Sequence, residues 1–347
     1  MKYRKLGRTG LDVSAICLGT MTFGRQNTEA EGHEQMDYAV GQGVNFFDTA
    51  ELYPTVPVSV ETIGGTETII GTWFAKRGKR DDVILATKVL GPGGFGPVDG
   101  ADLSPEKVRR SCERSLQRLQ TDYIDLYQLH WPNRGTYHFR QNWSYEPEKH
   151  DKQKALDDIE AVLGELGALV DEGKVRHVGL SNETVWGTAQ YLRIAGERNW
   201  PRIASVQNEY SLLHRIFDTD YAELCHHEDV GLLAFSPLAA GILSGKYRHG
   251  VVPRGSRMSI QPNLSGRFSE HSRPAIEAYL RVADKHDLDP AQMAIAFALS
   301  RPFMASVIIG ATKMEQLKTD IAAIDLELSG EVFDDILAVF RRYPLPM

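Results

Sequence analysis

Four side chains that can handle protons lie at or just after the ends of short apolar runs: Asp48, Tyr53, Lys88 and His130. An isolated Tyr hydroxyl has a pKa of about 10, and a neighbouring ammonium would lower that pKa by stabilising the phenolate. We therefore expect Lys88 to activate Tyr53 as a proton donor, Asp48 to hold Lys88, and His130 to orient a carbonyl oxygen. The hydride that completes a carbonyl reduction comes from no side chain, so these residues imply a nicotinamide cofactor.

Each of the four residues also has a plainer interpretation. Lys88 could be a surface lysine, His130 a core histidine, Tyr53 a loop aromatic and Asp48 a turn cap. A second chemical alternative is a barrel aldolase or isomerase in which Lys88 forms a Schiff base. A charged lysine paired with Asp48 would be a poor nucleophile for that reaction.

Short apolar segments alternate with helical segments along most of the chain. We expect strands at residues 16–18, 44–47, 83–87, 124–129, 175–180, 203–206, 231–235 and 306–309. We expect helices at 29–41, 67–75, 104–119, 155–171, 184–197, 220–227, 274–285, 290–299, 313–324 and 331–340. Ser104 followed by Pro105 supplies an N-cap and a proline at the first helical position.

Eight strand–helix units of this kind predict a parallel α/β sheet closed into a (β/α)8 TIM barrel. A doubly wound open sheet is the alternative. Residues 2–6 and 11–16 flank a turn and predict an N-terminal hairpin. We expect one domain over residues 1–347, because no linker divides the chain.

In such a barrel every strand ends at one rim, where active sites are built. Residues 132–153 and 239–272 predict two long loops at this C-terminal rim. The aromatic residues Phe23, Tyr137, Phe139, Trp143 and Tyr145 could line an apolar or ring-stacking pocket with Trp131. Packing of the first long loop against itself would explain them equally well.

Composition excludes several classes of protein. The 39 Lys and Arg residues against 46 Asp and Glu residues give a net charge of −7, and no basic block indicates nucleic-acid binding. No apolar run is long enough to span a membrane, and the N-terminus lacks a secretory signal. The 3 cysteines frame neither a disulfide scaffold nor a metal site, which favours a cytoplasmic protein. The sequence does not indicate an oligomeric state.

Several motifs resemble those of the aldo-keto reductase family. They are residues 19–21 (GTM), 47–53 (FDTAELY), 87–88 (TK), 122–132 (DYIDLYQLHWP), 179–182 (GLSN), 207–210 (QNEY) and 235–238 (FSPL). The surroundings of residues 67–68, Trp131 and the long segment after it are most similar to the bacterial Tas-type NADP(H)-dependent reductases. The resemblance implies a (β/α)8 barrel, the tetrad Asp48, Tyr53, Lys88 and His130, and a small carbonyl substrate near Tyr53, His130 and Trp131.

The same resemblance implies an extended NADP(H) site without a Rossmann fold. The nicotinamide half would contact Thr20, Met21, Asp48, Ser181, Asn182 and Gln207, with Tyr210 stacking on the ring. The pyrophosphate would lie along Ser236, Leu238, Gly241 and Lys246. The adenosine 2′-phosphate end would contact Gly310, Thr312 and Lys313, with Gln316 and Asp320 nearby. A helix N-terminus after residue 312 agrees with a phosphate there, although Thr312 could simply cap that helix. The acidic Asp320 leaves NAD(H) open as an alternative.

The family also includes regulatory β subunits of potassium channels that keep the tetrad. A cofactor-binding regulatory subunit with little turnover is therefore the alternative to an NADPH-dependent reductase of aldehydes or ketones. We expect no metal, because no spacing of ligands supports a metal site.

Overall fold

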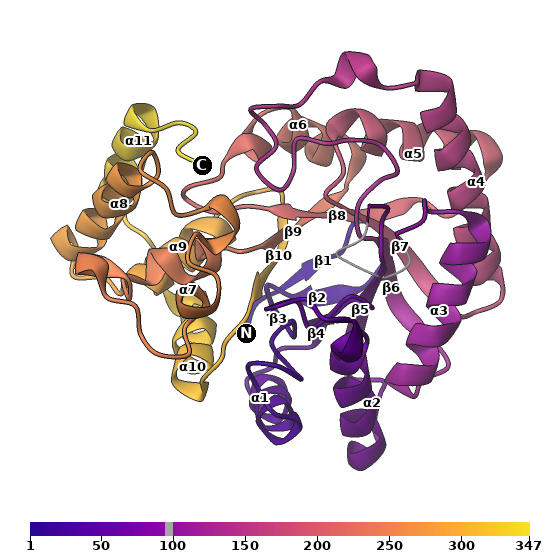
Figure 1. Ribbon diagram of the computed structural model, residues 1–347, viewed down its shortest axis with the longest axis horizontal. Helices are drawn as coiled ribbons and strands as arrows, with labels where there is room; N and C mark the ends of the chain where they lie inside the picture. The colour runs from indigo at the N-terminus through magenta and orange to yellow at the C-terminus, as the bar shows by residue number, and fades with distance from the viewer. Residues whose placement is uncertain (94–99) are drawn as a thin grey trace.

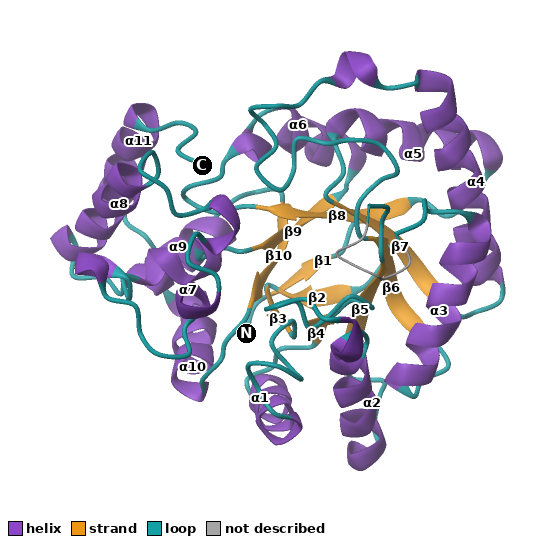
Figure 2. Cartoon of the chain, in the orientation of Figure 1, coloured by secondary structure: helices purple, strands orange, loops and turns teal. Residues whose placement is uncertain are grey.

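The computed structural model describes residues 1–93 and 100–347, and a closed barrel of parallel strands forms its centre (Figure 2). In chain order the strands are β3 (Ile16–Gly19), β4 (Phe46–Asp48), β5 (Ile84–Val89), β6 (Ile124–Leu129), β7 (Val175–Ser181), β8 (Ile203–Glu209), β9 (Gly231–Phe235) and β10 (Met304–Ile309). Each strand pairs with its chain neighbour, and β10 pairs with β3 to close the ring. The predicted TIM barrel is confirmed, and the open-sheet alternative is wrong.

Helices surround the strands on all sides of the barrel (Figure 1). They are α1 (Glu29–Gly41), α2 (Gly65–Arg77), α3 (Pro105–Leu119), α4 (Lys152–Asp171), α5 (Val185–Arg198), α6 (Asp220–Glu228), α7 (Arg257–Ile260), α8 (Arg273–Lys285), α9 (Pro290–Leu299), α10 (Met314–Ala322) and α11 (Gly330–Arg342). Local capping explains several helix starts. Ser104 accepts from the Lys107 amide at the start of α3, and Thr28 forms a reciprocal capping box with Glu31 at the start of α1.

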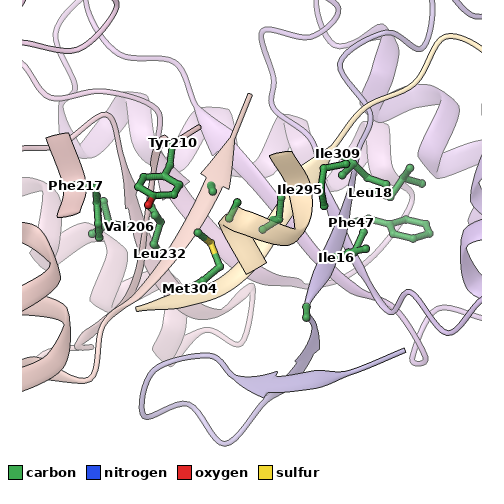
Figure 3. Packing of buried hydrophobic residues seen from close by; sticks show 14 of the residues in the cluster. Ile16, Leu18, Phe47, Val206, Tyr210, Phe217, Leu232, Ile295, Met304 and Ile309 are labelled. Atoms are coloured by element: carbon green, nitrogen blue, oxygen red, sulfur yellow. The ribbon is translucent and has the colours of Figure 1, made fainter. Parts of the chain in front are cut away.

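Buried apolar side chains form two separate layers, because alternate residues of a strand point to opposite faces. Ile16 and Leu18 of β3 point outward and join the layer between barrel and helices, part of which Figure 3 shows. Cys17, between them, points into the barrel. The barrel wall therefore has apolar contacts on both sides.

The predicted N-terminal hairpin is confirmed and consists of β1 (Tyr3–Lys5) and β2 (Asp12–Ser14). It packs against one end of the barrel interior. Its Leu6 and Val13 are fully buried and belong to the interior cluster. Gly7 has a φ of +52°, and a Cβ there would lie 2.5 Å from the Ala204 carbonyl oxygen. A side chain at position 7 would thus prevent the hairpin from packing against the barrel.

The two expected long loops follow β6 and β9 and contain short helical segments that the sequence analysis did not predict. The first carries the 3₁₀ helix η2 (Pro147–Lys149), and α4 already begins at Lys152. The second carries α7 and the 3₁₀ helices η4 (Ala239–Ser244), η5 (Arg248–Gly250) and η6 (Leu264–Gly266). The remaining 3₁₀ helices are η1 (Val60–Thr62), η3 (Ile216–Asp218) and η7 (Ala323–Asp325). Within residues 1–93 and 100–347, no helix has both the length and the apolar character that crossing a membrane requires.

Candidate active site

Asp48, Lys88 and Tyr53 lie together at the carboxyl ends of β4 and β5. Lys88 Nζ is 2.7 Å from Asp48 Oδ2 and 3.5 Å from the Tyr53 hydroxyl, and it also donates to the Thr49 carbonyl at 2.8 Å. The Lys88 side chain has no exposed surface. Its ammonium is therefore held by three oxygens, one of them the phenol that it was predicted to activate.

Burial and the neighbouring ammonium shift the pKa of Tyr53 in opposite directions. Burial raises the pKa of the Tyr53 phenol, the Lys88 ammonium lowers it, and the net pKa lies above its ordinary value. Lys88 therefore lowers this pKa as expected, but burial outweighs its influence. Burial by itself would lower the pKa of Lys88, but Asp48 and Tyr53 raise it, so the lysine stays charged.

His130 lies beside Tyr53, with ring centroids 5.8 Å apart and planes at 77°. Burial, reinforced by the positive charge of Lys88, holds the pKa of His130 well below its usual range, so the imidazole is neutral at physiological pH. Its buried Nδ1 has no hydrogen-bond partner in the part of the chain that the structure describes. A neutral ring of this kind can offer one N–H to a substrate oxygen.

Two glutamine side chains orient Asp48 from inside the barrel. Gln207 Nε2 donates to Asp48 Oδ1 at 2.7 Å, and Gln128 Nε2 approaches the same oxygen at 3.4 Å. Gln128 was missed by the sequence analysis. Its signal was available, because it is a polar residue two positions before His130 and therefore on the same face of the strand.

Ser181 and Asn182 lie next to the tetrad at the end of β7. Ser181 Oγ donates to the Gln207 carbonyl at 2.9 Å, and Asn182 Nδ2 donates to the His130 carbonyl at 3.0 Å. The buried Asn182 Oδ1 accepts no hydrogen bond from any described residue. Thr20 also contacts the tetrad, because its hydroxyl donates to the Asp48 carbonyl at 2.8 Å. Met21, the next residue, is half-buried.

Tyr210 does not reach this group of residues. It is fully buried in the outer layer, stacked on Phe297 at 6.3 Å, and its hydroxyl donates to Asp218 at 2.7 Å (Figure 3). Its ring has no exposed face for a nicotinamide. Phe235, at the end of β9, is instead half-buried and packs against the barrel-interior cluster. The sequence analysis missed Phe235, although it stands directly before Ser236 in one of the recognised motifs.

The chain turns tightly after β9. Ser236 and Gly241 have φ values of +55° and +90°, and Leu238 between them is half-buried. A Cβ on Gly241 would lie 2.7 Å from Lys246 Nζ, so the lysine ammonium lies directly against this turn. Only a glycine at position 241 leaves room for the Lys246 ammonium.

The segment from Gly310 to α10 contributes further polar side chains. Gln316 Oε1 accepts from the Thr312 amide at 3.0 Å and from its hydroxyl at 3.1 Å. The exposed Lys313, and not Thr312, holds the N-cap position of α10, and its side chain makes no cap hydrogen bond. The alternative of Thr312 as the cap is therefore wrong. Asp320 is buried here. Burial and Asp289 raise the pKa of its carboxyl to about 7, with Lys246 opposing.

Three arginines of the long loops gather around Glu209 at the end of β8, one of them acts on Tyr53, and the sequence analysis missed all three. Arg140 and Arg267 bind the same buried carboxylate, Glu209, at 2.9 and 2.6 Å. Burial would raise the pKa of Glu209, but the arginines lower it to about 2. Burial, reinforced by Arg267, lowers the pKa of Arg257 to about 10, and its charge acts on Tyr53. Arginines in polar loops give no distinctive sequence signal, so only the fold reveals this cluster.

Most of the aromatic residues considered for a substrate pocket lie elsewhere in the structure. Phe23 is in the core, Tyr137 packs on Tyr145, and Trp143 is 72% exposed. Trp131 contacts His130 at a centroid distance of 4.9 Å and Phe139 at 5.8 Å. Self-packing of the loop is therefore right for Tyr137 and Tyr145, whereas Phe139 extends the aromatic side of the site.

Comparison with known proteins agrees with this geometry. The sequence profile described as "Aldo/keto reductase family" matches residues 15–340. The chain is 44% identical to "Protein tas" of Escherichia coli (strain K12), over 100% of this chain and 99% of the relative. It is 35% identical to "Uncharacterized oxidoreductase YrpG" of Bacillus subtilis (strain 168), over 98% and 96%. It is 30% identical to "Probable voltage-gated potassium channel subunit beta" of Arabidopsis thaliana, over 99% and 98%.

Proposed function

The chain belongs to the Aldo/keto reductase family of oxidoreductases, and on that premise we propose that it reduces an aldehyde or ketone to the alcohol with NADPH. The observation that carries the proposal is the buried Asp48–Lys88–Tyr53 relay, with contacts of 2.7 and 3.5 Å, beside a neutral His130. This relay can deliver a proton to a carbonyl oxygen in a site that excludes most water.

Each residue of the relay has a distinct role. Tyr53 gives its hydroxyl proton to the carbonyl oxygen, and Lys88 stabilises the phenolate that remains. Asp48 keeps Lys88 charged, and His130 donates its N–H to the same carbonyl oxygen to orient it. A reduced nicotinamide, when bound, supplies the hydride that no side chain can supply.

The residues around the relay fit the nicotinamide end of such a cofactor. The unpartnered Asn182 Oδ1 can accept from a carboxamide N–H, next to Ser181 and Gln207. We assign the ring-stacking role to Phe235 in place of Tyr210, because Phe235 faces the barrel interior and keeps some exposed surface. Thr20 and Met21 border this end of the site.

The remaining predicted residues fit the phosphates. Ser236, Leu238, Gly241 and Lys246 lie in or directly after the turn that follows β9. Arg257, which interacts electrostatically with Tyr247 next to Lys246, adds a second cation. At the far end, Gly310, Thr312 and Lys313 precede the N-terminus of α10, where free backbone amides favour an anion. Gln316 and Asp320 lie within α10 for the adenosine part.

The Arabidopsis thaliana relative, named as a probable voltage-gated potassium channel subunit beta, supports a second candidate. A regulatory subunit of that kind would bind the cofactor and turn over slowly. The Schiff-base alternative is weaker, because Asp48 and Tyr53 keep Lys88 charged and a charged amine does not attack a carbonyl.

A panel of aldehydes and ketones, assayed with NADPH and NADH side by side, tests the proposal. We expect steady, multiple-turnover oxidation of NADPH with at least one carbonyl, and slower turnover with NADH. A protein that binds NADPH tightly but reduces no member of the panel would favour the regulatory candidate. Borohydride trapping of a substrate on Lys88 would favour the Schiff-base alternative.

A further inference from the structure

The aromatic side of the site continues outward from Tyr53 as an unbroken series of ring contacts. The centroid distances are 5.8 Å from Tyr53 to His130, 4.9 Å from His130 to Trp131 and 5.8 Å from Trp131 to Phe139. The last pair meets edge to face, with planes at 87°. Phe139 keeps 38% of its surface exposed, so the outer end of the series remains open to a ligand.

The Trp131 indole is locked in position. Its Nε1 donates to the Pro92 carbonyl at 2.8 Å. A Cβ on Gly91 would lie 2.3 Å from Trp131 Cδ1, so the ring lies directly against the backbone of residue 91. Trp131 therefore provides a fixed surface against which Phe139 is placed.

Phe139 is held by an unusual backbone. Phe139 and Arg140 have φ values of +56° and +64°, a region that L-residues rarely occupy unless their surroundings hold them there. The hold comes from Arg140, whose Nη1 donates to Glu209 Oε2 at 2.9 Å. Arg267 donates to the other oxygen of Glu209 at 2.6 Å, so the carboxylate joins both long loops to the end of β8.

The neighbouring aromatic side chains on the same loop are not arranged this way. Tyr137 packs on Tyr145 at 5.7 Å, and Tyr145 packs on His150 at 5.7 Å. Trp143 is 72% exposed. Among the described residues of this loop, Phe139 alone joins the ring series that starts at Tyr53.

We propose that Phe139 is a specificity-determining residue that favours carbonyls attached to an aromatic ring. With Trp131 it presents two perpendicular ring surfaces, against which a planar ring can stack or make an edge contact while its carbonyl reaches Tyr53. Arg140 acts through Phe139 as a positioning residue. This inference rests on the proposed carbonyl reductase activity.

The test compares benzaldehyde with hexanal as substrates of the full-length protein with NADPH. In Phe139→Leu, the kcat/KM ratio of benzaldehyde to hexanal should fall by about 5- to 10-fold, because the ring contact is lost while an apolar side chain remains. Trp143→Leu, an exposed aromatic residue of the same loop, should leave the ratio unchanged. Arg140→Gln should lower the ratio as Phe139→Leu does, because Phe139 is no longer held, while kcat for hexanal stays near the wild-type value.

Two outcomes would overturn the inference. One is that Phe139→Leu keeps wild-type kcat/KM for both aldehydes, and the other is that it loses kcat/KM equally for both, since the ratio is unchanged in either case. Saturation-transfer NMR with benzyl alcohol gives a readout independent of turnover, and its ring signal should weaken in Phe139→Leu but not in Trp143→Leu. A wild type that reduces no member of the carbonyl panel, these two aldehydes included, would contradict the proposed function, whereas normal turnover with an unchanged ratio would contradict only the role of Phe139.

Discussion

The two ends of the barrel interior differ sharply in chemistry, although the same strands build both. At the amino end, Phe46, Ala86 and Leu126 join Leu6 and Val13 of the hairpin in an apolar cluster. Two residues further along the same inward face of each strand, the side chains become Asp48, Lys88 and Gln128. One step of the strand repeat therefore separates a hydrophobic core from a buried ionic network.

This difference shows that the amino end of the barrel interior serves stability and the carboxyl end serves chemistry. Burying apolar surface at the amino end favours folding. Burying the Lys88–Asp48 pair contributes little net stability, because desolvation of two charges offsets their attraction. The ionic end is nevertheless useful for chemistry, because charges act more strongly in a site from which water is excluded.

The strongest test of the ionic end is Tyr53→Phe. We expect carbonyl reduction to fall by about 100- to 10,000-fold, the range typical of a lost general acid. NADPH binding, followed by fluorescence, should survive, because the phenyl ring remains. Tyr127→Phe removes a buried phenol that faces the outer layer and serves as the control. Equal loss of binding and turnover in Tyr53→Phe would contradict the proton-donor role.

Lys88→Met tests whether the Lys88 ammonium activates the Tyr53 hydroxyl. Removing the ammonium removes the influence that lowers the pKa of Tyr53, so that pKa should rise further. The alkaline limb of the pH–rate profile should move to higher pH, and kcat should fall by about 100-fold or more. Lys149→Met, at an exposed lysine, is the matched control. An unshifted limb would show that Lys88 does not act on the phenol.

Leu6→Ala tests the apolar end. Leu6 is fully buried in the hairpin, so its truncation should lower the free energy of unfolding by about 2–5 kcal/mol. Urea denaturation measures this change. The kcat of the folded protein should stay within about 2-fold of wild type, because the cavity lies at the end opposite the tetrad. A large loss of kcat in Leu6→Ala without a change in the free energy of unfolding would contradict the separation of stability and chemistry between the two ends.

Asp320→Asn should have the most pH-dependent effect. Because the folded-state pKa of Asp320 is raised to about 7, the native protein holds this proton more tightly than the unfolded chain. The wild type should therefore lose stability relative to Asp320→Asn as pH rises from about 4 to 7, by on the order of 2–4 kcal/mol. Thermal unfolding at several pH values checks this sign, since the advantage of the variant should vanish at low pH.

The cofactor gives a second readout at the same position. Above about pH 7 the Asp320 carboxylate is charged and should repel a 2′-phosphate, so the KM for NADPH should rise with pH in the wild type. That rise should be absent in Asp320→Asn and absent for NADH. A parallel rise for both cofactors would show that Asp320 does not lie near the 2′-phosphate.

Much of the fold could be predicted because its signals are local. Strand and helix periodicity, the Ser104–Pro105 cap and the hairpin turn each depend on neighbours in the chain. The predicted places of Asp48, Lys88 and His130 at strand ends followed from the same periodicity. Parallel strands then bring such ends to one rim, whatever their separation in sequence.

Other features depended on contacts between distant segments. Tyr210 and Phe235 both stand in recognised motifs, but only the closed barrel decides that Tyr210 faces the helices and Phe235 the interior. The net pKa of Tyr53 depends on how completely the folded chain buries the phenol. The arrangement of Phe139 depends on Glu209, which lies 69 residues from Arg140 in the chain.

The sequence by itself determined the eightfold strand–helix order and the identity of the groups that could carry protons, since both are properties of residue type and spacing. Only the tertiary structure decided which of those groups are desolvated, which ring faces the site and which loop side chains share a carboxylate. The physical reason is that burial and through-space charge depend on all the segments that pack around an atom, and most of those segments are remote in the chain.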